Sequence, residues 1–368
     1  MVIGVVGLGA MGLGIAQVYA QAGHVVRVTD AVAGARGSAM TRLAAALAPR
    51  VEKGAMTAAE RDAVLSRLLV VDRIEDIAPA DLVIEAVVED AAAKRTVFLA
   101  LADVLPLAIL ATNTSSLSVA SLATGLPQPG RLIGLHFFNP APAMKLVELI
   151  GHAGSDPDAL TIARHLTEAA GKTVITAPDR PGFIVNRCAR PFYGEALALL
   201  EEGHTPAAID AAMLAAGYRI GPLSLIDLIG ADINLAASEG LWAAMGGHPR
   251  YHVFAALQEQ VAAGRLGRKA GQGFVYPATV AAHPDDAIVS RIEATLVNEA
   301  AWLLAEGVVT EAGIDTALKL GLNFPRGPYE ILALRGADTI RATLAACEAA
   351  APPHLTGRYL PAPKVQAR

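Results

Sequence analysis

Two residues in the segment GLHFFNPAPAMKLVELI, residues 134–150, have side chains suited to transferring a proton. His136 stands at the end of an apolar run, and Glu148 follows it 12 positions later. A histidine titrates near neutral pH, so it can accept a proton and return it. A carboxylate bound to its far ring nitrogen would fix the tautomer and stabilise the imidazolium. The pair therefore predicts a proton-transfer site with His136 as the base.

The start of the chain has the order of elements that a dinucleotide-binding domain requires. An apolar strand over residues 2–7 runs into GLGAMG, a helix is expected over 14–22, and a second strand over 25–29 ends at Asp30. Asp30 would accept hydrogen bonds from the adenosine ribose hydroxyls and repel a 2′-phosphate. We therefore expect NAD as the cofactor rather than NADP, with a hydride leaving to the nicotinamide.

The three glycines of GLGAMG each have a separate task in such a domain. Gly7 permits the tight turn, Gly9 lets the pyrophosphate approach the backbone, and Gly12 lets the helix pack against the strand. The N-terminus of the helix then faces the pyrophosphate. GxGxxG alone is a weak signal, but its place between a strand and a helix supports a Rossmann-type α/β domain, which we predict over residues 1–180.

Polar residues follow two further strands, which are predicted over residues 109–112 and 132–138. The carboxyl ends of parallel strands line the ligand crevice in sheets of this kind. Asn113 and Ser115 follow the first of these strands, and His136 lies near the end of the second. Taken alone, His136 could be a core histidine with satisfied hydrogen bonds, and Ser115 could be a helix N-cap.

A polar segment over residues 41–69 interrupts the alternation of strands and helices. Scattered charges of this kind usually belong to a solvated pair of helices, and the spacing alone favours that interpretation. The alternative is a lid whose cations, Lys53 among them, meet a phosphorylated substrate tail.

The C-terminal half repeats one helical pattern. Residues 184–232 and 288–338 match at an offset that grows from 104 to 106. The matches include Arg187 with Arg291, Glu195 with Glu299, Glu202-Gly203 with Glu306-Gly307, Ile209-Asp210 with Ile314-Asp315, and Gly230-Ala231-Asp232 with Gly336-Ala337-Asp338. We therefore predict a duplicated all-α domain, with copies over 181–280 and 285–350 and a tail over 351–368.

The two copies differ at one position of interest, where Asn186 in the first is Ser290 in the second. We expect the first copy to contact the substrate and the second to take the packing place of a partner subunit's domain. The protein is then either a homodimer or a monomer whose duplicated domain is pseudo-dimeric.

Composition limits the class of protein and its partners. The 368 residues are 53% hydrophobic and 18% charged, which excludes a disordered chain. A net charge of −5 without a basic block argues against nucleic acid. Two cysteines, Cys188 and Cys347, fit a reducing cytosol, and neither a signal peptide nor a membrane span is predicted. We expect a cytoplasmic protein without a bound metal.

These motifs together resemble the 3-hydroxyacyl-CoA dehydrogenase family over nearly the whole chain. The resemblance rests on GLGAMGLGIA (7–16), DLVIEAVVED (81–90), NTSSLS (113–118), GLHFFNPAPAMKLVEL (134–149), PGFIVNR (181–187) and GRKAGQGF (267–274). GLGAMG alone also occurs in 3-hydroxyisobutyrate and 6-phosphogluconate dehydrogenases, whose lysine is not found here in its expected setting. The chain is similar to the longer bacterial members, including those of phenylacetate degradation, which carry a second helical copy.

The resemblance implies a role for each matching residue. His136 would be the catalytic base and Glu148 its orienting partner, while Ser115 and Asn186 would hold the hydroxyl and carbonyl region of an acyl-CoA. The implied cofactor-binding residues are Gly7, Gly9, Met11, Gly12, Asp30, Glu89, Lys94 and Asn113. Lys53 would approach the CoA phosphates, which favours the lid interpretation of residues 41–69.

Simpler interpretations remain for three of these residues. Glu148 could be a surface carboxylate near a helix start, Lys94 an exposed helix lysine, and Asn186 a cap or a helix–helix contact.

The implied activity is NAD-dependent oxidation of an (S)-3-hydroxyacyl-CoA to a 3-oxoacyl-CoA, in fatty acid or phenylacetate-type β-oxidation. Two alternatives are a β-hydroxyacid dehydrogenase acting on a free acid and a non-catalytic, crystallin-like member. The acyl group stays open among butyryl, longer fatty acyl and dicarboxylic chains. We expect one active site in each chain, in the crevice between the cofactor domain and the first helical copy.

Overall fold

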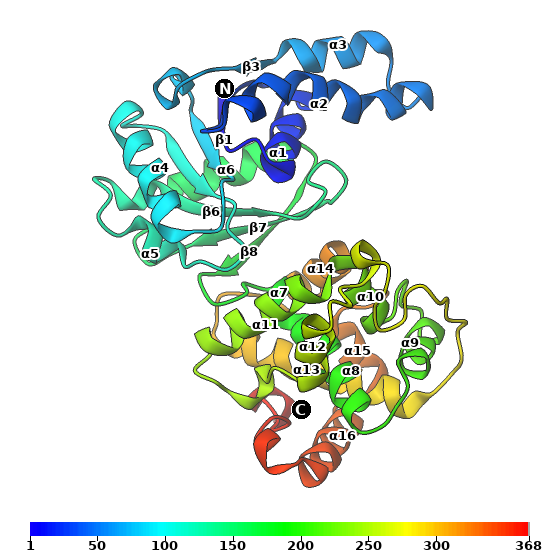
Figure 1. The fold of residues 1–368 in the computed structure, drawn as a ribbon. Helices are drawn as coiled ribbons and strands as arrows, with labels where there is room; N and C mark the ends of the chain where they lie inside the picture. Colours follow the sequence, from blue (N-terminus) through cyan, green and yellow to red (C-terminus); the bar gives the residue numbers. More distant parts are fainter. Residues whose placement is uncertain (367–368) are drawn as a thin grey trace. The chain divides into compact units, whose positions relative to one another are not determined.

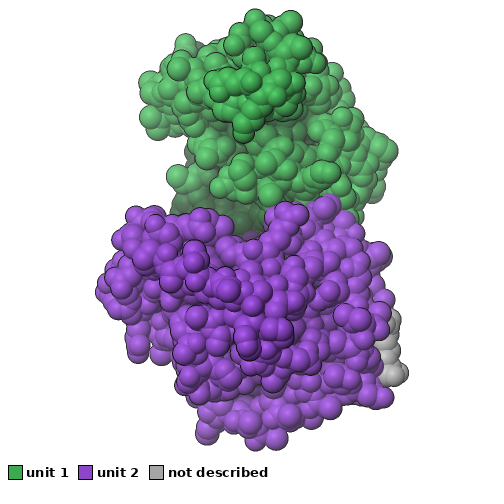
Figure 2. All heavy atoms as spheres, turned by 90° about the vertical axis from the view of Figure 1, so that its right-hand side faces the viewer, with its two compact units in different colours: residues 1–180 green, residues 181–368 purple. Residues whose placement is uncertain are grey.

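The computed structural model describes residues 1–366 and divides the chain into two compact units, Met1–Arg180 and Pro181–Arg368 (Figures 1 and 2). Within the described range, no helix is both long and apolar enough to cross a membrane. The first unit combines a sheet with helices, and the second is helical (Figure 1).

Unit 1 is organised around one eight-stranded sheet in the order β3-β2-β1-β4-β5-β6-β7-β8. The strands are β1 (Val2–Val6), β2 (Val25–Thr29), β3 (Leu68–Val70), β4 (Leu82–Glu85), β5 (Ile109–Thr112), β6 (Leu132–Phe137), β7 (Leu146–Gly151) and β8 (Thr173–Pro178). All neighbouring strands are parallel except β6 and β7. Their short runs of valine, leucine and isoleucine suit strands buried on both faces. The strand order confirms the predicted Rossmann-type fold.

The helices of unit 1 are α1 (Ala10–Gln21), α2 (Ala33–Glu52), α3 (Ala58–Ser66), α4 (Ala91–Val104), α5 (Val119–Ala123) and α6 (Pro157–Ala169). The predicted helical segment 41–69 corresponds to most of α2, to α3, and to the start of β3. A capping box of Thr57 and Glu60 begins α3, since the side chain of each residue accepts the backbone N–H of the other. In Figure 1 α2 and α3 lie side by side as a helical pair.

Unit 2 consists of two related sets of helices. The first copy contains α7 (Val185–Cys188), α8 (Arg190–Glu201), α9 (Pro206–Ala215), α10 (Pro222–Ile229), α11 (Ala231–Ala244) and α12 (Ala255–Ala262). The second contains α13 (Asp286–Ala305), α14 (Glu311–Leu322), α15 (Pro328–Arg335), α16 (Ala337–Ala350) and α17 (Pro363–Gln366). By sequence alignment α9, α10 and α11 correspond to α14, α15 and α16. The fold therefore contains the predicted duplication.

One difference between the copies lies in their first helix. The single helix α13 covers the positions of both α7 and α8. Pro191 stands at the start of α8, whereas the second copy has Thr295 at that position. A proline has no N–H to donate within a helix, so the first copy is interrupted there and the second continues.

The same capping device is built twice. Asp210 accepts two backbone N–H groups from the first turn of α10, at 3.0 and 2.8 Å. Asp315 does the same for α15, at 2.8 and 3.1 Å. Gly221-Pro222, at the start of α10, recurs as Gly327-Pro328 at the start of α15. The Ile-Asp and Gly-Pro pairs recur together because each aspartate caps the helix that begins at the following Gly-Pro.

Arginine–glutamate pairs join the two copies in both directions. Arg187 of the first copy donates to Glu299 of the second at 2.7 Å, and Arg291 of the second donates to Glu195 of the first at 2.6 Å. Each arginine also bonds to a second, more exposed glutamate. Arg187 pairs with Glu306 at the end of α13, and Arg291 pairs with Glu202 at the end of α8. In a two-fold interface residue i meets j and j meets i, and this chain shows that reciprocity within itself.

Two Arg-Tyr dipeptides complete these pairs and extend the repeat beyond the predicted limits. Arg250 and Tyr251 donate to Glu299, and Arg358 and Tyr359 donate to Glu195. Residues 351–366, which we predicted as part of a tail, thus pack onto the helices, and Tyr359 is only 2% exposed. Each glutamate carboxylate is buried among two guanidinium groups and a tyrosine hydroxyl.

Candidate active site

The three glycines of the loop between β1 and α1 differ in how closely the fold packs around them. Gly7 has a φ of +100°, and a Cβ there would lie 2.5 Å from the Ala86 carbonyl oxygen. A Cβ on Gly12 would lie 1.8 Å from the carbonyl oxygen of Gly7. A Cβ on Gly9 would meet no atom within 4 Å. Packing therefore requires the first and third glycines, while the second leaves room beside the backbone for a ligand.

The surroundings of this loop suit the pyrophosphate of a dinucleotide. No side chain caps α1, and its first turn carries no acidic residue. The amide groups at this end are thus available to an anion. Asp30 at the end of β2 accepts the N–H of Leu8 at 2.6 Å and that of Val32 at 2.7 Å, which holds the loop in place. When bound, NAD would supply the acceptor for a hydride here.

Replacing Gly9 and Gly12 with alanine should separate cofactor binding from folding. Gly9→Ala is expected to weaken NAD binding at an unchanged melting temperature, because the new methyl group fills only the space kept for the ligand. Gly12→Ala is expected to lower the melting temperature, since the methyl group collides with the Gly7 carbonyl. Fluorescence titration with NADH and thermal melts of both variants measure this. A Gly9→Ala protein that binds NADH like the wild type would contradict the assignment.

A buried charge network lies at the carboxyl end of β4, the strand beside β1 in the sheet. The ammonium group of Lys94 on α4 is 2.7 Å from Glu85 at the end of β4 and 3.2 Å from Glu89. Lys94 is 1% exposed, so its alternative interpretation as an exposed helix lysine is wrong. Its contact with the cofactor stays a prediction. Our prediction omitted Glu85, although a lone carboxylate within the apolar run LVIEAVV was a usable signal.

Glu89 fixes the turn that carries Ser115. Its carboxylate accepts the hydroxyl of Thr114 at 2.6 Å and the backbone N–H groups of Ser115 and Ser116 at 2.9 and 3.1 Å. Burial alone would raise the pKa of Glu89, but the hydrogen bonds from Thr114 and Ser116 and the charge of Lys94 together lower it. An ionised Glu89 thus holds the turn in one conformation.

Ser115 is not the cap of the following helix. The side chain that caps α5 is Ser118, which accepts the N–H of Ser121 at 3.2 Å. The cap interpretation of Ser115 is therefore wrong. Ser115 lies instead in the turn directly after β5, next to the end of β6 in the sheet.

His136 and Glu148 form a buried pair. Antiparallel pairing of β6 with β7 places them directly opposite each other, so their spacing in sequence is that of a hairpin. His136 Nδ1 lies 2.6 Å from Glu148 Oε2, with the two residues 6% and 0% exposed. The interpretation of Glu148 as a surface carboxylate near a helix start is therefore wrong. We assign the Nδ1 proton to this hydrogen bond, which makes Nε2 the ring nitrogen that can accept a proton.

Two side chains hold the backbone on either side of this pair. Asn113 accepts the N–H of Phe137 at 2.8 Å, which ties the end of β6 to β5. Lys172, which our prediction missed, donates to the carbonyls of Ala141 at 2.6 Å and Met144 at 2.8 Å in the loop before β7. Burial lowers the pKa of Lys172. The connection between β6 and β7 is thus anchored on both of its sides.

Three predicted residues remain: Met11, Lys53 and Asn186. Met11 is partly buried in the first turn of α1, and Lys53 is exposed at the end of α2. Asn186 lies on α7 in unit 2. Unit 1 thus holds the glycine loop, the Ser115 turn and the His136–Glu148 pair, while a role of Asn186 stays a prediction.

Comparison with protein families matches both units. Residues 2–180 match the NAD-binding domain of 3-hydroxyacyl-CoA dehydrogenase. Residues 182–276 and 288–367 match the C-terminal domain of the same enzyme, which supports the duplication seen in unit 2.

Individual relatives agree with this match. A 3-hydroxyadipyl-CoA dehydrogenase of Escherichia coli is 34% identical, over 89% of each chain. A probable 3-hydroxybutyryl-CoA dehydrogenase of Bacillus subtilis is 42% identical, over 73% of this chain and 95% of its own. The crystal structure of a 3-hydroxybutyryl-CoA dehydrogenase from Escherichia coli superposes with a TM-score of 0.94 at 32% identity, covering 100% of this chain and 98% of that one.

Proposed function

Because the chain belongs to the 3-hydroxyacyl-CoA dehydrogenase family and carries its NAD-binding domain, we propose that it oxidises an (S)-3-hydroxyacyl-CoA to a 3-oxoacyl-CoA. The observation that supports this reaction most directly is the buried His136–Glu148 pair at 2.6 Å. A base fixed in one tautomer at the carboxyl edge of a dinucleotide-binding sheet suits removal of a proton from a hydroxyl group.

In the proposed reaction His136 takes the proton of the 3-hydroxyl group on Nε2. The imidazolium that forms is stabilised by the Glu148 carboxylate at Nδ1, in the way that a buried aspartate supports the histidine of a serine protease. Ser115, on the turn held by Glu89, would bind the substrate oxygen and orient it. Asn186 is proposed to contact the same region of the substrate, and Lys53 the phosphates of CoA.

The second helical copy carries serine in place of asparagine at this position. Ser290, its counterpart of Asn186, receives a hydrogen bond from Arg335 at 2.7 Å and donates to Asp286 at 3.1 Å. Arg335 also pairs with Glu293. An internal ion network thus occupies the corresponding surface of the second copy, which supports one active site in each chain.

An absorbance assay of NADH tests the proposed activity. We expect NADH oxidation with 3-oxoacyl-CoA substrates, measured with acetoacetyl-CoA, 3-oxohexanoyl-CoA and 3-oxoadipyl-CoA, and much slower oxidation with free acetoacetate. The names of the relatives include both hydroxybutyryl-CoA and hydroxyadipyl-CoA dehydrogenases, so they leave the acyl chain open. Faster turnover of the free acid would favour a β-hydroxyacid dehydrogenase. Absence of NADH oxidation with all three thioesters would contradict the proposal.

A further inference from the structure

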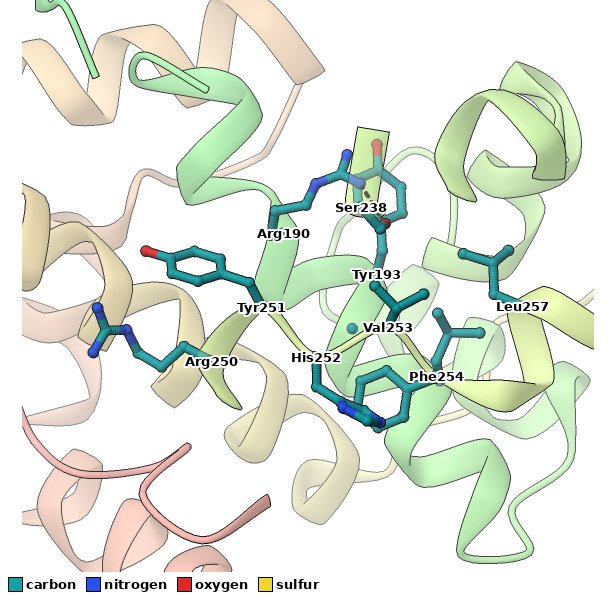
Figure 3. A pocket seen from close by; sticks show the side chains of 11 residues that line it. Arg190, Tyr193, Ser238, Arg250, Tyr251, His252, Val253, Phe254 and Leu257 are labelled. Carbon is teal, nitrogen blue, oxygen red and sulfur yellow. Dashed lines mark hydrogen bonds between the residues drawn. The ribbon is translucent and has the colours of Figure 1, made fainter. Parts of the chain in front are cut away.

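Arg190, at the start of α8, is a partly buried guanidinium with no carboxylate partner among residues 1–366. It donates to the backbone oxygen of Asn186 at 3.3 Å and to the hydroxyl of Ser238 at 3.0 Å, and it lies 4.7 Å from the centre of the Tyr193 ring. Figure 3 shows the bond to Ser238 and the neighbouring ring. Burial lowers the pKa of Arg190. A cation placed in this way without a counter-charge costs stability.

The more deeply buried arginines of unit 2 are treated differently. Arg187 and Arg358 are 2% and 4% exposed, and each is paired with a glutamate. The two arginines of unit 2 that are buried most deeply therefore have carboxylate partners, and Arg190 has none among the described residues.

A second polar side chain near Arg190 is also incompletely bonded. Asn234 on α11 is 2% exposed, and its side-chain oxygen has no hydrogen-bond partner among the described residues. Ser238, one turn later, donates to the backbone oxygen of Asn234 at 2.8 Å and accepts from Arg190. We call Arg190, Asn234 and Ser238 the arginine cluster. It joins α8 to α11, and Nη2 of Arg190 remains as a donor for an additional partner, while the Asn234 oxygen is an acceptor.

The second copy is an internal control for what the fold itself requires. At the positions equivalent to the arginine cluster it carries three apolar residues: Ala294, Ile340 and Leu344. These are 0%, 1% and 0% exposed. The same helical arrangement thus packs without any polar side chain at these positions. Helix packing therefore does not require the polar residues of the arginine cluster in the first copy.

We infer that Arg190 binds a carboxylate at the far end of the acyl chain, so that the preferred substrates are dicarboxylic 3-hydroxyacyl-CoA thioesters. This inference rests on the proposed function, because Asn186, proposed to contact the reacting region, precedes Arg190 by one helical turn. Ala189, between α7 and α8, keeps right-handed helical backbone angles, so these four residues rise about 6 Å. In a six-carbon dicarboxylic chain three carbon–carbon bonds, or roughly 4 Å, separate C3 from the terminal carboxyl carbon.

Chain length therefore distinguishes the candidate acyl groups. A butyryl chain ends one carbon beyond C3 and presents only a methyl group. An adipyl chain extends farther and ends in an anion that a guanidinium can bind through two parallel hydrogen bonds. Beside a partly buried cation, the uncharged end of a fatty acyl chain would leave the charge uncompensated.

Matched six-carbon substrates test the inference. Wild-type kcat/KM is expected to be roughly 10–100-fold higher for 3-oxoadipyl-CoA than for 3-oxohexanoyl-CoA, because hydrogen bonds between charged groups contribute that much. Arg190→Ala, which copies Ala294, should remove this preference by raising KM for the adipyl substrate while kcat/KM for the hexanoyl substrate is maintained. Arg190→Lys should restore part of it. Arg219→Ala, at an exposed arginine of the same unit, is the control.

The outcomes separate a binding role from a structural one. Equal loss on both substrates in Arg190→Ala would show that Arg190 only supports Asn186, and would overturn the inference, as would a wild type without preference for the adipyl substrate. Wild-type protein inactive on both thioesters would contradict the proposed function instead. Arg190→Gln, which keeps a polar side chain without the charge, gives a second measurement should Arg190→Ala fold poorly, and it too should raise KM for the adipyl substrate alone.

Discussion

Replacing His136 with glutamine is expected to lower kcat on the proposed acyl-CoA substrate by at least ~100-fold, the usual contribution of a general base. Glutamine keeps a polar side chain of similar reach but cannot accept the hydroxyl proton at neutral pH. NADH affinity should be retained, because the glycine loop and Asp30 lie on other strands of the sheet. Steady-state assays and NADH titration measure the two effects.

Two further variants show whether the loss belongs to the base itself. Glu148→Gln should lower kcat with NADH affinity retained, because the amide no longer stabilises the imidazolium. His165→Gln, at an exposed histidine of α6, should behave like the wild type. Turnover of His136→Gln at the wild-type rate would remove His136 from the mechanism. Loss of NADH binding in Glu148→Gln would point to a folding role for the carboxylate.

Replacing Glu299 with alanine is expected to destabilise unit 2 by about 3–5 kcal/mol, the cost of leaving a buried charge without its partner. The change would leave Arg187, Arg250 and Tyr251 without their shared acceptor. Because the two copies exchange these bonds reciprocally, Glu195→Ala should have an effect of similar size. Glu299→Gln retains an acceptor oxygen and should cost less.

The tryptophans make this stability measurement selective. Both tryptophans of the chain, Trp242 and Trp302, lie in unit 2, so their fluorescence during urea unfolding reports that unit. Trp302 also stacks under Arg250, 4.7 Å from its guanidinium carbon. Glu259→Ala, at an exposed glutamate of α12, is the matched control. A Glu299→Ala midpoint equal to that of the control would show that the exchanged pairs contribute nothing to stability.

The parts of the fold that were predictable depend on short-range patterns. β1, β2, β5 and β6 are apolar runs beside glycine or polar residues, and the glycine loop follows from its spacing together with its place between a strand and a helix. β7 escaped prediction because Glu148 interrupts its apolar run and its position depends on pairing with β6. The geometry of His136 and Glu148 is a consequence of that pairing, so the sequence suggested the two residues without revealing the strand that joins them.

Other parts of the candidate site depend on long-range partners that no local pattern contains. Lys94 resembles any helical lysine until β4 places Glu85 beside it. Glu89 was predicted to contact the cofactor, and the structure adds that it fixes the Ser115 turn. The Arg-Tyr dipeptides were visible as a repeat at an offset of 108, but only two identical residues mark it.

The reciprocal pairing of the helical copies has a consequence for how the protein responds to dilution. An interface between separate chains obeys mass action and weakens as concentration falls. Here residues 263–285 join α12 covalently to α13, so the contact between the two copies forms within one molecule. The Glu195 and Glu299 contacts should therefore persist at any enzyme concentration. The tether makes this interface a property of one polypeptide, independent of how much protein is present.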